Sequence, residues 1–205
     1  MFITFEGIEG SGKSTQIKLL QNSLREEGHV VEVLREPGTT KLGEKIRDIF
    51  LEKTNEKVDP ITEAFLLYAS RKHLDQNFLR EHLNKKSIVI ADRYSDATIA
   101  YQCFGKGLSR DFVDYIHQES NLLTPDLTFY MDISAEGSKS RIDDRELDRM
   151  ESESLDFFNK VRLGYLDIAK LNSERVIILD ATLPMEEIQK KIFIEVKNRL
   201  NASMD

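Results

Sequence analysis

Two periods of apolar residues alternate along the chain. Strand-length apolar runs occupy residues 2–5, 29–34, 87–91, 127–132 and 175–179. Between them, apolar residues recur every three or four positions and predict helices over residues 16–27, 42–51, 60–83, 95–103, 110–121, 152–171 and 184–200. Strands that alternate with helices build a parallel sheet with helices on both faces. The pattern, which contains no repeat or linker, predicts an α/β fold with five parallel strands in a single domain spanning residues 1–205.

A glycine-rich loop at residues 7–14 follows the first predicted strand and has the form G-x-x-x-x-G-K-S. Glycines let successive N–H groups converge on phosphate oxygens, Lys13 places a charge on the β- and γ-phosphates, and Ser14 offers a hydroxyl to Mg²⁺. The alternative, a glycine turn without a ligand, is disfavoured by the spacing and by the strand and helix on either side. The predicted nucleoside triphosphate site consists of Gly7, Ile8, Glu9, Gly10, Ser11, Gly12, Lys13, Ser14 and Thr15.

Asp92 and Arg93 come directly after the apolar run at residues 87–91. Ligands of open α/β sheets bind at the carboxyl ends of the strands. We therefore expect Asp92 to hold Mg²⁺ through water and Arg93 to face the reacting phosphates, because a planar guanidinium grips phosphate at two points. A surface ion pair is the alternative for Arg93.

A polar segment at about residues 134–150 carries three arginines, Arg141, Arg145 and Arg149. A short mobile lid that delivers an arginine to the transferring phosphoryl group has this composition. A solvated surface segment has it too, and the residues alone leave both possibilities open.

Composition narrows the class of protein. The 205 residues carry a net charge of −7, which disfavours partners such as nucleic acid or an acidic membrane. No apolar run approaches the roughly 20 residues of a membrane span. Cys103 is the single cysteine, and the first strand begins too early for a cleavable signal. We expect a cytoplasmic protein with neither a nucleic-acid nor a membrane partner.

Six short motifs occur in the order found in one enzyme family. They are FEGIEGSGKST at residues 5–15, REPG at 35–38, DRY at 92–94, AYQ at 100–102, PDL at 125–127 and ELDR at 146–149. From Met1 to about Ala181 the chain resembles bacterial thymidylate kinases. The resemblance implies the P-loop fold of nucleoside monophosphate kinases, a homodimer, and transfer of the γ-phosphoryl group of Mg·ATP to dTMP, giving dTDP and ADP for dTTP synthesis.

The resemblance also implies roles on the acceptor side. Arg47 and Arg93 would grip the acceptor phosphate, with Arg35 and a cis bond before Pro37 nearby. Glu9 would lie near the acceptor sugar.

The same resemblance assigns the base pocket. Arg71 would hydrogen-bond the base edge, Thr98 and Gln102 would complete base recognition, and Tyr101 would crowd the ribose 2′ position. From the residues alone, Arg71 could instead pair with Asp75 at i+4, and Thr98 and Gln102 could be ordinary exposed helix residues.

Two positions depart from the family. Leu67 stands where relatives commonly stack a phenylalanine on the base, and Phe65 lies about 200° away around the helix. The lid has fewer arginines than is usual, and Gly10 occupies the loop position where another subgroup has an arginine. We therefore expect Arg145 or Arg141 to supply the catalytic cation beside Lys13, and Arg149 to anchor the lid. A kinase for another monophosphate and a nucleotide sensor without turnover are the competing functions.

Overall fold

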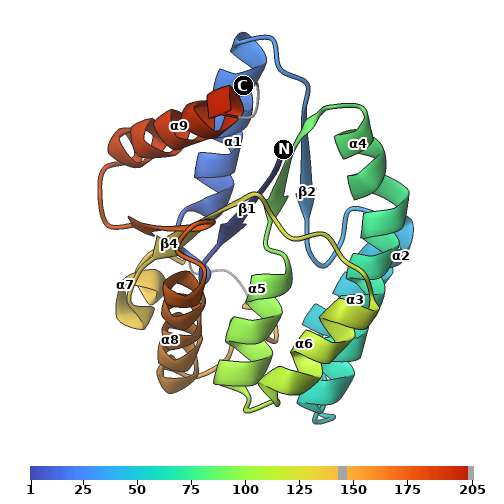
Figure 1. Cartoon of the computed structure of the whole chain (residues 1–205). Coiled ribbons are helices and arrows are strands. Elements are labelled where there is room, and N and C mark those ends of the chain that lie inside the picture. The colour runs from blue at the N-terminus through green and yellow to red at the C-terminus, as the bar shows by residue number, and fades with distance from the viewer. Residues whose placement is uncertain (143–146, 203–205) are drawn as a thin grey trace.

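The structure of the chain is a computed structural model that describes residues 1–142 and 147–202 (Figure 1). The catalytic candidate Arg145 lies outside the described residues. The elements in chain order are β1 Phe2–Glu6, α1 Lys13–Glu26, β2 Val31–Arg35, α2 Lys41–Leu51, α3 Pro60–Leu74, η1 Asp75–Leu79, α4 Arg80–Asn84, β3 Ile88–Asp92, α5 Ser95–Thr98, η2 Ile99–Gly105, α6 Arg110–Glu119, β4 Leu127–Asp132, α7 Ala135–Lys139, α8 Leu155–Leu171, β5 Val176–Asp180 and α9 Met185–Ala202.

The five strands form one parallel sheet in the order β2-β3-β1-β4-β5, as predicted. Side chains that alternate along a strand enter different cores. Ile3 and Phe5 pack in the larger cluster with apolar residues of α1 and α9, whereas Phe2 packs with Leu74 and Leu79 beside β3. Helices therefore cover both faces of the sheet, and β1 lies at its centre with the carboxyl ends of β1 and β3 adjacent.

Two predicted helices are interrupted by π-helical turns. The helix expected over residues 60–83 is α3, the π-helical η1 and α4; the one expected over 95–103 is the short α5 followed by the π-helical η2. Across η1, Arg80 at the start of α4 pairs with the buried Asp75 five residues earlier at 2.7 Å, a spacing that matches the wider π turn. Apolar periodicity does not reveal such turns.

β2 and α8 begin later than predicted, and the expected lid contains a helix. β2 begins at Val31 rather than at residue 29, because the N–H of His29 still donates to Leu24 of the preceding helix. α8 begins at Leu155 rather than at residue 152, because the hydroxyl of Ser154 caps it by accepting from the N–H of Phe157. The segment expected to be a polar lid contains the short helix α7.

Gly164 of α8 allows the close approach of η2. A Cβ at this position would lie 2.8 Å from Cγ of Phe104 and 3.0 Å from the backbone Cα of Ala100. Because η2 carries Tyr101 and Gln102, this packing positions two candidate site residues.

We expect Gly164→Ala to destabilise the protein by up to about 2 kcal/mol. Forcing a methyl into this contact costs about 1–3 kcal/mol, which exceeds the gain of about 1 kcal/mol in helix propensity. Urea unfolding measures the effect, with Leu163→Ala as the control because Leu163 is 60% exposed on the same helix. A more stable Gly164→Ala variant would contradict the packing argument.

Candidate active site

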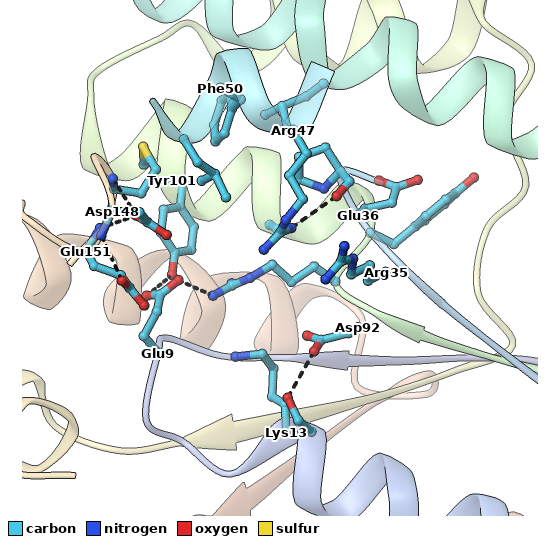
Figure 2. Close-up of a pocket in the computed structure, with 18 of the residues that line it drawn as sticks. Glu9, Lys13, Arg35, Glu36, Arg47, Phe50, Asp92, Tyr101, Asp148 and Glu151 are labelled. Carbon is cyan, nitrogen blue, oxygen red and sulfur yellow. Dashed lines mark hydrogen bonds and ion pairs between the residues drawn. The ribbon is translucent and has the colours of Figure 1, made fainter. Parts of the chain in front are cut away.

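A cavity of about 570 Å³ opens at the carboxyl edge of the sheet (Figure 2). It is lined by predicted site residues from six regions of the chain. Those are Glu9, Gly10, Gly12, Lys13, Ser14, Thr15, Arg35, Pro37, Arg47, Leu67, Arg71, Asp92, Arg93, Thr98, Tyr101, Gln102 and Arg141. Gly7, Ile8 and Ser11 complete the loop between β1 and α1 without lining the cavity.

The loop requires its glycines. Gly7 and Gly10 have positive φ angles of 140° and 71°, and a Cβ on either would lie 2.8 Å from a backbone carbonyl oxygen, of Met131 or Ser138. α1 begins after Gly12, and no side chain caps its N-terminus. Its first N–H groups can therefore bind a ligand. A helix N-terminus of this kind, with convergent loop N–H groups, is a site for phosphate.

Lys13 is buried beneath this loop. Its Nζ donates to the carbonyls of Gly7 at 3.0 Å and Ile8 at 3.1 Å. Burial and the nearby Arg93 together lower the pKa of Lys13 to about 8, although Asp92 opposes the shift. The ammonium is therefore a charge that an incoming polyphosphate would stabilise.

Ser14 and Asp92 bring two oxygens together. The hydroxyl of Ser14 donates to Oδ2 of Asp92 at 3.3 Å, because β3 pairs with β1 and ends beside the loop (Figure 2). Among the described residues no cluster of three or more His, Cys, Asp or Glu could hold a metal ion. Two oxygens of this kind fit Mg²⁺, which retains waters and takes further ligands from substrate phosphates.

Arg93 adopts a left-handed backbone conformation, with a φ of 70°. Its guanidinium bonds Oε1 of Glu9 at 2.5 Å and the hydroxyl of Tyr165 at 3.2 Å, and lies 4.9 Å from the ring centre of Tyr101. Tyr101 donates to the other oxygen of Glu9 at 2.9 Å. Burial favours the neutral form of Glu9, but Arg93 and Lys13 outweigh it and hold the pKa of Glu9 below its usual value.

Two further arginines line the cavity, Arg35 at the end of β2 and Arg47 in α2. The Glu36–Pro37 bond is cis, and Arg47 of α2 donates to the carbonyl of Pro37 at 3.1 Å. Arg35 pairs with Glu44 at 2.8 Å and is largely exposed. With Arg93 these side chains give the cavity a second cationic region apart from the loop (Figure 2).

Arg71 is buried and does not use Asp75 as its partner. Its Nε donates to Glu36 at 2.6 Å, and its Nη2 donates to the carbonyl of Tyr94 and to the hydroxyl of Thr98. Nη1 is buried and has no hydrogen-bond partner among the described residues. The i+4 pairing considered from the sequence is therefore wrong, and one donor of Arg71 remains available at the cavity.

Gln102 donates through Nε2 to the buried Glu63 at 3.0 Å, so it is not an exposed helix residue. Leu67 lies in the cavity wall, whereas Phe65 is 56% exposed and packs on Phe112 instead. Sequence analysis missed Phe50, which is buried and lines the same cavity. It belongs to the apolar stripe of α2, and that stripe alone does not separate core from cavity wall.

Arg141, which follows α7 in the segment expected to form a lid, lines the cavity, where its Nη1 donates to the carbonyl of Ala181 at 2.8 Å. Arg149 donates to the carbonyl of Phe50 and to Glu63, contacts that agree with the anchoring role expected for it. Sequence analysis also missed Asp148 and Glu151, which line the cavity on the side of Glu9 (Figure 2). The motif at residues 146–149 contains Asp148 and was the signal that could have found it, whereas Glu151 lies outside that motif.

The family model for thymidylate kinase matches residues 5–192 of the chain. The chain belongs to the thymidylate kinase family. It is 43% identical over 210 residues to a thymidylate kinase of Prosthecochloris aestuarii, an alignment that covers 97% of this chain and 94% of the relative. A thymidylate kinase of Thermoanaerobacter sp. is 40% identical over 200 residues, with 97% and 98% covered.

A solved structure shares the fold of this thymidylate kinase family member. The crystal structure of thymidylate kinase from Ehrlichia chaffeensis superposes with a TM-score of 0.78 at 32% identity, covering 96% of this chain and 98% of that one. The fold is therefore the P-loop nucleoside monophosphate kinase fold that the sequence predicted.

We expect binding of a nucleoside triphosphate to take up close to one proton at pH 9 and none at Lys13 at pH 7. The reason is that free Lys13, with a pKa of about 8, is mostly neutral at pH 9 and must be charged to pair with phosphate. Calorimetric titrations in buffers of different ionisation enthalpy measure the uptake. Lys13→Arg is the matched control, since a guanidinium stays charged at both pH values; equal proton balance in wild type at both pH values would contradict the expectation.

Proposed function

We propose that this chain transfers the γ-phosphoryl group of ATP to dTMP, giving dTDP and ADP. The observation that carries the proposal is one cavity that joins a phosphate-binding loop to a separate cationic region and a polar base pocket. Its family membership supports the same acceptor. A nucleotide sensor would need the first of these three parts only.

ATP binds with its phosphates on the loop from Gly7 to Thr15, where Lys13 and the N-terminus of α1 supply positive charge. Ser14 directly and Asp92 through water would hold Mg²⁺, which would supply positive charge to offset that of the phosphates. Both roles are supported by the positions of these side chains beside the loop.

The acceptor phosphate lies between Arg93, Arg47 and Arg35. Its second pKa is about 6, so at neutral pH the dianion attacks without a protein base. The residues must therefore offset the repulsion between two polyanions and hold them in line. Glu9 helps by orienting Arg93, which it contacts directly.

Lys13, Arg93 and an arginine of the lid stabilise the charge that spreads over the transferring phosphoryl group. An arginine delivered in this way can raise the rate by roughly 10³-fold or more. Arg141 lines the cavity from the described part of the lid, and Arg145 is the other candidate for this role.

The base lies against Leu67, with Arg71, Thr98 and Gln102 at its edge. Tyr101 packs where a ribose 2′-hydroxyl would lie, which favours deoxyribonucleotides. Glu9 lies on the side of the pocket that takes the sugar of the acceptor nucleotide. These placements are supported by the shared cavity and by the unpartnered Nη1 of Arg71.

ADP release measured with Mg·ATP and dTMP, dUMP, UMP, dCMP, CMP or AMP tests the function. We expect strong preference for dTMP, because the polar edge of the pocket matches thymine. Preference for another monophosphate would keep the reaction and reject the acceptor. If no acceptor causes ADP release while ATP still binds, the result would favour a nucleotide sensor without turnover.

We propose that the protein is a homodimer that uses α3 and α6. Ile61, Phe65 and Tyr115 expose large apolar or aromatic side chains there, and Phe65 stacks edge-on against Phe112. Apolar side chains gathered in this way favour a protein partner, and the family resemblance makes that partner a second copy.

We propose the cytoplasm as the location of the protein. Its single cysteine, Cys103, fits a reducing compartment of this kind.

We expect sedimentation velocity to give a dimer for wild type and a monomer for Phe65→Glu, because a charge placed in the interface would remain desolvated and unpaired. Lys18→Glu on the exposed part of α1 is the control and stays dimeric. A monomeric wild type would reject the assembly without bearing on the reaction.

No helix in the described ranges combines the length and the apolar character that crossing a membrane would require.

A further inference from the structure

Glu63 joins the base pocket to the end of the lid. This carboxylate of α3 is fully buried and accepts from three residues in two other segments of the chain. Its Oε2 accepts from Nε2 of Gln102 at 3.0 Å; its Oε1 accepts from Nζ of Lys106 at 2.7 Å and Nη1 of Arg149 at 2.5 Å. The two cations balance a charge that would be costly to bury alone.

This arrangement fixes the direction of the Gln102 amide. A carboxylate oxygen only accepts hydrogen bonds, so Gln102 must present its NH₂ group to Glu63 and its carbonyl oxygen elsewhere. That Oε1 is buried and has no partner among the described residues, and Gln102 lines the cavity. Nη1 of Arg71 is a buried donor in the lining of the same cavity and likewise has no partner among the described residues. Gln102 and Arg71 thus offer an acceptor and a donor, beside the unpartnered Oε1 of Glu36 and hydroxyl of Tyr94 in the same lining.

We propose that Glu63 is a positioning residue that sets the hydrogen-bonding polarity of the base pocket by holding Gln102 with its acceptor toward the base. Thymine offers the O4 acceptor and the N3–H donor, which complement Arg71 and Gln102. Cytosine offers the opposite pair, an N4 donor and an N3 acceptor. The role rests on the proposed function, because it assumes that a nucleoside monophosphate base occupies this pocket.

Replacing Glu63 by glutamine should reverse this polarity. The side-chain oxygen of the new residue must still accept from Lys106 and Arg149, so its NH₂ group takes the place of Oε2 and donates to Gln102. The Gln102 amide then turns and presents its own NH₂ to the base. The N3–H donor of thymine then meets the NH₂ donor of Gln102, whereas the N3 acceptor of cytosine gains a hydrogen bond from it.

The test compares kcat and KM for dTMP and dCMP in wild type and Glu63→Gln. We expect the dTMP-to-dCMP ratio of kcat/KM to fall about tenfold or more, through a higher KM for dTMP, because a mismatched buried polar pair costs about that much. Glu153→Gln is the matched control: Glu153 contacts only the outer side of Lys106, at 3.4 Å, and its substitution should leave the ratio unchanged. An equal loss with both acceptors in Glu63→Gln would mean a purely structural role and overturn the proposal.

Glu63→Asp provides a second variant should Glu63→Gln not fold. Aspartate still only accepts, so the ratio should stay at the wild-type value even where both KM values rise. A lowered ratio in Glu63→Asp would overturn the proposal. If wild type itself prefers another monophosphate, the proposed function fails, and the UMP-to-CMP ratio in the same variants decides the role of Glu63.

Discussion

Arg71 is fully buried and Arg93 and Arg149 are largely buried, so each would lose several kcal/mol of solvation without a partner for its charge. Each is held by a carboxylate from a distant part of the sequence: Arg93 by Glu9, Arg71 by Glu36 and Arg149 by Glu63. Arg93 and Arg71 line one cavity. Arg149 shares Glu63 with Gln102, which lines the same cavity. The requirement to pair buried charge therefore fixes the geometry on which phosphate and base recognition depend.

The same pairs explain how a protein with a net charge of −7 forms a site for two polyanions. The carboxylates neutralise the arginines in the absence of ligand and keep them in place. Glu9 is the clearest case, since it bonds both Arg93 and Tyr101. A phosphate that approaches Arg93 meets a cation that is already oriented, so less conformational entropy is lost on binding.

The π-helical η2 shows how the backbone contributes. Tyr101 and Gln102 are adjacent in sequence, yet one contacts Glu9 near the phosphates and the other contacts Glu63 deep in the pocket. A π turn is wider than an α turn and often occurs at functional sites. It lets consecutive side chains reach both regions while Gly164 keeps η2 tightly packed on α8.

Sequence patterns alone were enough to predict the five parallel strands, the phosphate-binding loop and the place of Asp92 and Arg93 at the end of β3. The spacing of apolar residues, the spacing of glycines and the ends of strands are local properties of the chain. These patterns did not determine the partner of Arg71, the burial of Glu63 and Gln102, or the place of Phe50, Asp148 and Glu151 in the cavity wall. Those depend on which residues from distant segments meet. An i+4 carboxylate was visible in the sequence beside Arg71, but Glu36, thirty-five residues away, lies closer in the fold. Only tertiary packing decides between a local and a distant partner, since both offer the same chemistry.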